Sequence, residues 1–251
     1  MRFHELTWPL LKAVDRSSTV VILPIAACEQ HSLHLPTFTD TILVTGVAEG
    51  VEQRLPNEVL LLPTLWLGAS HHHLPFGATL SASVELHVAI LRELLVEMLN
   101  EGFQRVLVLN GHGGNIDTMK MALRSIQPQF RDRLVTASSY WDLAEAELAA
   151  LAEGPRKTMG HACEFETSMV MALRPELVRV DQIRNDPNAE RPVLRGVYVS
   201  EDMQQMTHQG AVGYPELASA EKGRRFLDAA ITRTCEVVHA LQATQLPIAR
   251  D

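Results

Sequence analysis

A segment near the N-terminus combines carboxylates with a histidine, the side chains that bind Zn²⁺, Mn²⁺ and Fe²⁺. Residues 28–40 read CEQHSLHLPTFTD and include Glu29, His31 and Asp40. Side chains two residues apart in an extended chain point to the same side, so Glu29 and His31 can face one cavity. Asp40 lies where a helix is expected to start, and its carboxylate could bridge two ions. The alternative is that these acids are solvated and Asp40 only favours the helix N-terminus.

A second candidate segment is NGHGGN, residues 110–115, which places His112 directly after a predicted strand. The glycines allow the chain to turn sharply from the strand into a helix. The backbone N–H groups of Gly113 and Gly114 could stabilise an oxyanion on a substrate. They could also hold a phosphate, but the segment matches neither GxGxxG nor the P-loop and no Lys follows it. We therefore regard a nucleotide site as the weaker alternative.

A third candidate segment, GHACEFETS at residues 160–168, contributes His161, Glu164 and Glu166. In a helix, residues three apart share a face, so His161 and Glu164 are expected to reach the same site while Glu166 points away. Glu164 is therefore the predicted metal ligand and Glu166 a structural acid. The alternative is a helix start at which Glu only complements the helix dipole.

The remaining candidates are expected to contact a substrate. The three histidines 71–73 cannot all face one ion, so we expect this segment to form a lid or to contact the substrate. His72 is the member expected to bind the substrate. Trp141, at the end of a predicted strand, could stack on a flat substrate or simply pack in the core. Lys157 and Trp141 together suggest a pocket for a flat or partly anionic small molecule.

Short apolar runs and amphipathic stretches alternate along the chain and would position these segments. The runs predict buried parallel strands, and the stretches predict helices, with Thr39 and Ser83 as possible N-caps. The strands are expected at 19–25, 58–63, 104–110 and 133–139, and the helices at 39–54, 83–101, 115–127, 140–153 and 216–244. This order predicts one α/β domain over residues 1–251, layered, with a mainly parallel sheet flanked by helices. Ligands bind such sheets outside the carboxyl ends of the strands, where the candidate segments lie. The stretch 179–215, which contains Pro187 and Pro192, is expected to be irregular.

The composition restricts the partners. The chain has 251 residues, 22 Lys and Arg against 30 Asp and Glu, and a net charge of −8, which argues against nucleic acid or an anionic membrane as the main partner. Its three cysteines are widely spaced and form no disulfide framework, so a cytoplasmic location is expected. Neither a signal peptide nor an apolar run of the roughly 18 residues needed to span a membrane is recognised.

Taken together, the segments resemble the creatininase (creatinine amidohydrolase) family. The pattern of that family around its first metal cluster is approximately PxGSxEQHGxHLPxxTD, and residues 24–40 read PIAACEQHSLHLPTFTD. NGHGGN, SYWD (139–142), HACEFETS and ASAEKGR (218–224) follow in the family's order. The resemblance implies a two-metal centre, usually in a hexamer, that hydrolyses amide-type C–N bonds.

The resemblance also implies roles for individual residues. Glu29 and His112 would hold one metal, His31 and Glu164 the other, and Asp40 would bridge them. Two divalent ions roughly 3.5–4 Å apart would share a hydroxide that attacks the carbonyl carbon, and the ions would be Zn²⁺ first, with Mn²⁺ or Fe²⁺ possible. His161 would donate a proton to the departing nitrogen, and Asp40 could relay one.

Departures from the family pattern bear on the substrate. Creatininases proper resemble NGHYEN at the third strand and take a metal-binding Glu from it, where this chain has Gly114. They also carry a substrate-facing Trp where this chain has Lys157. The arrangement is similar to the non-creatininase branch, which includes formamide hydrolases of flavin and deazaflavin synthesis and a peptide-trimming enzyme. We therefore expect a cyclic amide or formamide-type small molecule as substrate and a homo-oligomer. Creatinine hydrolysis, peptide trimming and a non-catalytic metal-binding role are the alternatives.

Overall fold

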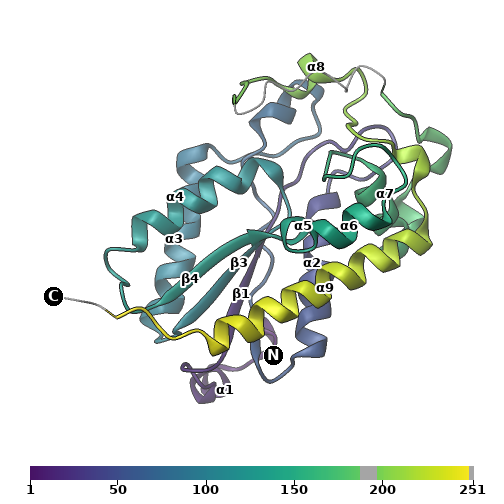
Figure 1. The fold of residues 1–251 in the computed structure, drawn as a ribbon. Helices are drawn as coiled ribbons and strands as arrows, with labels where there is room; N and C mark the ends of the chain where they lie inside the picture. The colour runs from purple at the N-terminus through teal and green to yellow at the C-terminus, as the bar shows by residue number, and fades with distance from the viewer. Residues whose placement is uncertain (187–196, 249–251) are drawn as a thin grey trace.

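The computed structural model describes residues 1–186 and 197–248 of the chain, and a four-stranded parallel sheet lies at its centre (Figure 1). The strand order is β2–β1–β3–β4, and every neighbouring pair is parallel. The strands are β1 (Val20–Ile25), β2 (Val59–Leu61), β3 (Arg105–Asn110) and β4 (Leu134–Ser139). All four lie within the predicted apolar runs, and parallel pairing sends their carboxyl ends to one edge of the sheet.

Helices cover both faces of the sheet, so the expected layered α/β class is confirmed. Successive side chains of a strand point to opposite faces. Val20 and Ile22 of β1 therefore pack in the core cluster beneath α2, α7 and α9, whereas Val21 and Leu23 pack with α3 and α4. These helices are α2 (Thr39–Arg54), α3 (Val84–Asn100), α4 (Ile116–Ile126), α7 (Glu164–Leu173) and α9 (Ala220–Ala243).

The shorter elements connect these layers. They are η1 (Phe3–Glu5), α1 (Trp8–Ala13), η2 (His71–Phe76), η3 (Gly113–Asn115), α5 (Tyr140–Leu143), α6 (Glu145–Leu151), η4 (Pro175–Leu177), η5 (Val180–Gln182), α8 (Met203–Met206) and η7 (Pro215–Leu217). The single helix expected over 140–153 is thus two short helices, separated at Ala144. The helix expected over 216–244 begins only at Ala220, where the side chain of Ser219 accepts a hydrogen bond from the N–H of Lys222.

One of the two predicted N-caps is correct. The Ser83 hydroxyl accepts a hydrogen bond from the N–H of Leu86 and caps α3. Thr39 is instead the first helical residue of α2, and its hydroxyl donates to the carbonyl of Pro36. The turn through Pro36 engages the hydroxyl, so Thr39 does not serve as the cap.

The described part of the stretch 179–215 covers the end of the molecule above the strand termini. There α8 lies against η2, and the Gln204 side chain donates to the carbonyl of Pro75 at 2.9 Å. Pro187 and Pro192, expected in an irregular segment, lie outside the described residues. Among the residues that the structure describes, no helix is both long and apolar enough to cross a membrane.

Candidate metal centre

A buried cluster of histidines and carboxylates lies outside the carboxyl ends of β1 and β3. Glu29 and His31 follow β1, Asp40 lies in the first turn of α2, and His112 follows β3 after Gly111. All four are almost completely buried, with 3% or less of each residue exposed. The structure therefore brings together four of the five predicted ligands.

Asp40 lies between two halves of this cluster. Its Oδ1 is 3.1 Å from Nε2 of His31, and its Oδ2 is 3.0 Å from Nδ1 of His112. Glu29 stands on the His112 side, with its Oε1 3.2 Å from the same Nδ1 atom. One carboxylate thus presents each oxygen to a different imidazole, which is the arrangement that a bridging ligand requires.

The donor atoms of the cluster fit divalent metal ions. Three groups have ligand atoms within 4.8 Å of one another: Glu29, His31 and His161; Glu29, His72 and His112; and His31, Asp40 and Glu166. Glu29 Oε2, His31 Nε2 and Asp40 Oδ2 are buried without a hydrogen bond of good geometry. Leaving such an atom unsatisfied costs roughly 1–3 kcal/mol, so each is a place where a cation would be stabilised. Imidazole and carboxylate donors suit Zn²⁺, Mn²⁺ and Fe²⁺.

The charges within the cluster shift its pKa values strongly. Burial opposes the protonation of His112, but the negative charges of Glu29 and Asp40 outweigh it and raise the pKa of His112 to about 10. Burial also opposes the ionisation of Asp40, yet His31 and His112 hold its pKa well below the usual range. Burial raises the pKa of Glu29 above its usual value. Protons on the imidazoles thus neutralise the carboxylates, and a divalent cation would compete with those protons.

The structure corrects the prediction for the acids of α7. Glu164 faces away from the cluster: its carboxylate accepts hydrogen bonds from the N–H groups of Glu153 and Gly154, both at 2.9 Å, and from Lys222 Nζ at 2.7 Å. Glu166 faces the cluster instead, with Oε1 3.7 Å from Nε2 of His31. Helical spacing does not apply between residues 161 and 164 because α7 begins only at Glu164 and Ala162 has a positive φ of 47°. A correct prediction that α7 begins at Glu164 would have shown which of the two glutamates faces the cluster.

These two glutamates allow a matched test of metal binding. We expect Glu166→Gln to weaken retention of one metal ion by more than about 100-fold, because the substitution removes a charged donor beside His31. We expect Glu164→Gln to retain the metal but to lower the free energy of unfolding by about 2–3 kcal/mol, since Lys222 loses its buried partner. Elemental analysis and denaturant unfolding of both variants would measure these effects. The reverse outcome, with metal lost from Glu164→Gln alone, would contradict the correction.

The histidine triplet lies in η2 and contributes more to the cluster than expected. In a 3₁₀-helix, adjacent side chains point about a third of a turn apart, so two of three can face one side. His73 is buried, with Nε2 3.3 Å from Glu29 Oε1, and the His72 ring stacks on that of His112 at 5.7 Å between centroids. His71 is exposed. Sequence analysis missed His73, because a run of three histidines carries no period that identifies its buried member.

Gln30, also missed from the sequence, orients two of the histidines. The N–H of Ser32 donates to Gln30 Oε1 at 2.9 Å, so the amide nitrogen of Gln30 must be the atom that donates to Nδ1 of His73 at 2.8 Å. His73 therefore carries its own proton on Nε2, toward Glu29. Nε2 of His161 donates to the carbonyl of Gln30 at 2.7 Å, which leaves Nδ1 of His161 directed at Glu29 Oε1, 3.6 Å away.

His161, like His72, is a member of the cluster that solvent reaches. The side chain of His161 is 13% exposed. Exposure is 6% or less for the side chains of the carboxylates and histidines that form ion pairs in the cluster, which are Glu29, His31, Asp40, His73, His112 and Glu166. Desolvation and then the positive charge of His31 lower the pKa of His161 well below its usual value. The imidazole is therefore neutral at pH 7, with Nδ1 directed at the cluster.

The two predicted substrate contacts Trp141 and Lys157 share a cavity of about 130 Å³. Lys157 Nζ donates to the carbonyl of Ala152 at 2.7 Å. The cavity adjoins the cluster through Cys163, whose Sγ lies 3.7 Å from Sδ of Met159 in the cavity wall and 3.8 Å from Glu166 Oε2.

The predicted glycine contacts differ from one another. A Cβ on Gly114 would lie 2.5 Å from Nε2 of His112 and 2.9 Å from Cε1 of His72, so the close approach of these rings requires glycine. A Cβ on Gly113 would meet no atom within 4 Å. Gly114 is thus explained by packing, and the N–H groups of both residues stay candidates for substrate contact.

Comparison with known proteins agrees with this geometry. The creatininase (creatinine amidohydrolase) family matches residues 4–238. The chain belongs to the creatininase family. This creatininase-family protein is 28% identical to a creatinine amidohydrolase of Pseudomonas putida, over 93% of the chain and 94% of that protein. It is 30% identical to a mycofactocin precursor peptide peptidase of Mycobacterium tuberculosis, over 86% of the chain and 82% of that protein.

Solved structures of creatininases share the fold. A crystal structure of creatinine amidohydrolase (creatininase) aligns with a TM-score of 0.82 at 28% identity, covering 95% of this chain and 96% of the other. Two further creatininase structures among the similar ones are described as a manganese form and a zinc–zinc type. The resemblance to this family is thereby confirmed. The chain is a creatininase-family amidohydrolase with candidate metal-ligand groups of Glu, His and Asp.

Proposed function

We propose that this protein hydrolyses a C–N bond in a small-molecule amide, of cyclic amide or formamide type, with two divalent metal ions. The observation that carries the proposal is the position of Asp40, whose two oxygens face two imidazoles of separate half-sites. Glu29, His112 and Asp40 would hold one ion. His31, Glu166 and Asp40 would hold the other, with Zn²⁺ as the first choice and Mn²⁺ or Fe²⁺ as alternatives.

The residues of the chain would divide the remaining work. Divalent ions at this cluster would polarise the amide carbonyl and activate a water for attack at neutral pH. Nε2 of His161 is engaged by the Gln30 carbonyl and Nδ1 faces the cluster, so Nδ1 would accept the proton of the attacking water. The same atom would then donate that proton to the departing nitrogen, as a single residue can act first as base and then as acid. Gln30 would keep the ring in this orientation through its carbonyl oxygen.

Substrate recognition would use the rim of the cluster. His72 and the N–H groups of Gly113 and Gly114 lie beside His112 and are proposed to contact the reacting carbonyl side. Trp141 would supply a flat apolar wall for the rest of the substrate. Lys157, on the same cavity, would favour a substrate with a carboxylate or another anionic group.

Peptide trimming is a second candidate function. It is favoured by one observation, the 30% identity to a mycofactocin precursor peptide peptidase over 86% of this chain. The same two-metal cluster could hydrolyse a peptide C–N bond, so the size of the accepted substrate distinguishes the two candidates.

The test is a comparison of substrates with chelated and metal-reloaded protein. We expect turnover of a formamide or a cyclic amide, creatinine included in the panel, that appears only with two equivalents of metal per chain. Turnover of short peptides alone would replace the proposal with the peptidase. Binding of two metal equivalents without turnover of any substrate class would indicate the non-catalytic alternative.

A further inference from the structure

One buried histidine beside the metal cluster belongs to none of the ligand groups of the described residues. His34 lies three residues after His31 in the loop that follows β1, and only 1% of it is exposed. Its ring reaches α7, where Nε2 lies 2.9 Å from the hydroxyl oxygen of Thr167. Its carbonyl accepts a hydrogen bond from the N–H of Arg179 at 2.9 Å, which fixes the main chain of His34 from a third segment. His34 thus connects the loop that carries His31 to the start of α7.

The two ring nitrogens of His34 show which way its hydrogen bond runs. Burial, and then the positive charge of His31, lower the pKa of His34 to about 4, so the ring is neutral at pH 7 and carries one proton. Nδ1 is buried without a hydrogen bond among the described residues, and a buried N–H without an acceptor is costly. The proton therefore lies on Nε2, which donates to Thr167. The Thr167 hydroxyl in turn donates to the carbonyl of Ala162 at 3.4 Å.

The last acceptor in this series, Ala162, has a strained backbone. Its φ of 47° lies in the left-handed region, which is unfavourable for a residue with a Cβ. Such a conformation persists where surrounding contacts hold it. Ala162 lies between His161 and the start of α7 at Glu164, so its conformation sets the direction in which the chain leaves His161 and enters the helix that carries Glu166.

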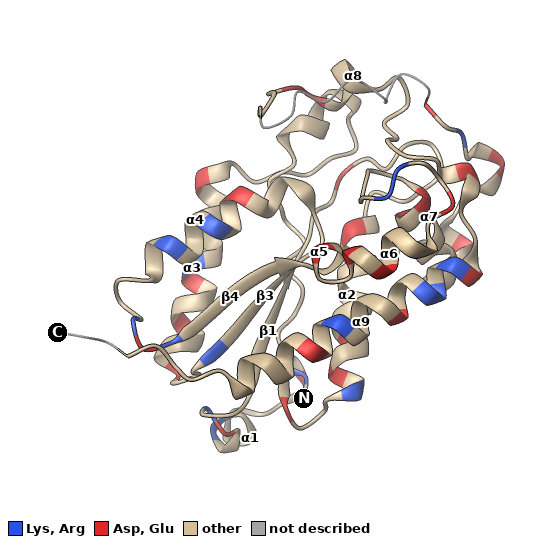
Figure 2. Ribbon diagram, viewed as in Figure 1, with Lys and Arg blue, Asp and Glu red and all other residues tan. Residues whose placement is uncertain are grey.

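Both segments that His34 connects supply groups to the same half of the metal cluster. Nε2 of His31 lies 3.1 Å from Asp40 Oδ1 and 3.7 Å from Glu166 Oε1. The first turns of α2 and α7 therefore bring their acids together at this end of the molecule (Figure 2). A shift of the loop relative to α7 would separate His31 from Glu166.

We propose that His34 is a positioning residue of the metal centre. Through the Thr167 hydroxyl it holds Ala162 in the left-handed conformation, and it thereby directs Glu166 toward His31. The inference rests on the proposed two-metal function, but it concerns the shape of the site and is independent of the substrate. His34 itself touches neither metal nor substrate in this role.

Two amides at residue 34 and one change at residue 167 test the hydrogen bonds. The amide nitrogen of His34→Gln can take the place of Nε2, whereas the shorter amide of His34→Asn takes the place of Nδ1 and does not reach Thr167. We expect His34→Asn to weaken retention of one Zn²⁺ ion and to lower kcat, each by at least about tenfold, and His34→Gln to stay within about threefold. Thr167→Val removes the hydroxyl, keeps the shape of the side chain and should reproduce His34→Asn. Competition with a chelator of known affinity measures the retention of metal.

A rescue at residue 162 distinguishes positioning from a loss of stability alone. Glycine adopts the left-handed conformation without the penalty of a Cβ. Ala162→Gly should therefore restore most of the metal retention and kcat that Thr167→Val loses. If the Thr167 hydroxyl only stabilised the fold, the double variant would be no better than Thr167→Val.

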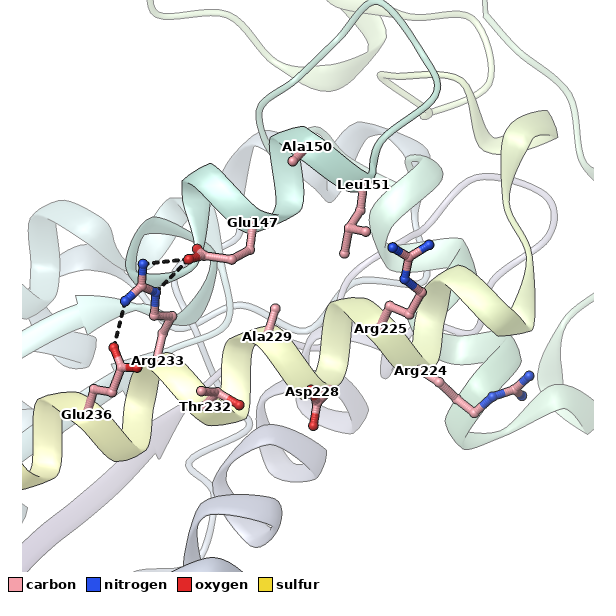
Figure 3. A pocket seen from close by; sticks show the side chains of 10 residues that line it. All are labelled: Glu147, Ala150, Leu151, Arg224, Arg225, Asp228, Ala229, Thr232, Arg233 and Glu236. Atoms are coloured by element: carbon pink, nitrogen blue, oxygen red, sulfur yellow. Dashed lines mark hydrogen bonds and ion pairs between the residues drawn. The ribbon is translucent and has the colours of Figure 1, made fainter.

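Arg233→Leu is the control for the loss of a hydrogen-bonded link between two elements. Arg233 of α9 binds Glu147 of α6 at 2.8 Å, in a groove whose lining residues lie outside the ligand groups (Figure 3). This variant should leave metal retention and kcat unchanged. Unchanged retention and kcat in His34→Asn, or a double variant without recovery, would overturn the proposal. Two bound ions without turnover in the unsubstituted protein would overturn the proposed function instead, and metal retention would still decide the role of His34.

Discussion

Asp40→Asn is expected to remove both metal ions and to lower kcat/KM by at least about 10³-fold, equivalent to about 4 kcal/mol. The substitution keeps the shape of the side chain but removes the negative charge that both His31 and His112 face at 3.0–3.1 Å. Because the two oxygens serve different halves of the cluster, the loss should affect both metals together. Elemental analysis after gel filtration and steady-state kinetics with the substrate found in the panel would measure the two effects.

Asp117→Asn is the matched control for this experiment. Asp117 is the second residue of α4 as Asp40 is the second of α2, so both variants lose the same interaction with a helix N-terminus. Asp117 is exposed, however, and lies outside the ligand groups. If Asp40→Asn kept two metal equivalents and activity within tenfold of the unsubstituted protein, the bridging role of Asp40 would be refuted.

His161→Ala is expected to keep both metals and to lower kcat by about 10²–10⁴-fold, the usual contribution of a general acid or base. Its Nε2 is engaged by the Gln30 carbonyl, and its Nδ1 faces the cluster from the side that solvent reaches. This position suits proton transfer to and from substrate. The measurement is a comparison of kcat, KM and metal content in the same preparation.

The metal content decides between three roles for His161. Loss of metal in proportion to turnover would make His161 a ligand, as its place in a group with Glu29 and His31 permits. Unchanged turnover would make it structural. His4→Ala, which removes an exposed histidine from the N-terminal segment, should change neither quantity and controls for the loss of an imidazole.

The layered fold could be predicted from the sequence because its signals are local and redundant. Each predicted strand is a short apolar run that ends in polar residues, and helical periodicity fills the intervals. Burial on both faces requires such runs, so the pattern and the parallel sheet have one physical cause. The break at Ala144 was not predicted, and neither was the start of α9 at Ala220, where the Ser219 side chain caps the helix by accepting a hydrogen bond from the N–H of Lys222.

The candidate site was predicted in part for a related reason. Glu29, His31 and His112 lie in the loops that follow predicted strands, and Asp40 lies at the start of a predicted helix. The ends of parallel strands converge on one edge of the sheet. Glu164 was predicted wrongly because its direction depends on the residue at which α7 begins. His73 was missed because its importance arises from contacts with Glu29 and Gln30, which lie far from it in the chain. Gln30 was missed because its importance arises from contacts with His73 and His161, which are equally distant segments.

The sequence alone determined the family resemblance, the α/β class and the donor chemistry of the metal cluster, since residue types and local periodicity carry that information. Only the tertiary structure decided which acid of α7 faces the cluster, which histidine of the triplet is buried, and which nitrogen of His161 is directed at the cluster. Each of these choices is a direction in space, set by helix starts, a positive φ and hydrogen bonds between distant segments. A one-dimensional pattern specifies the donors, and the packed chain specifies where each donor points.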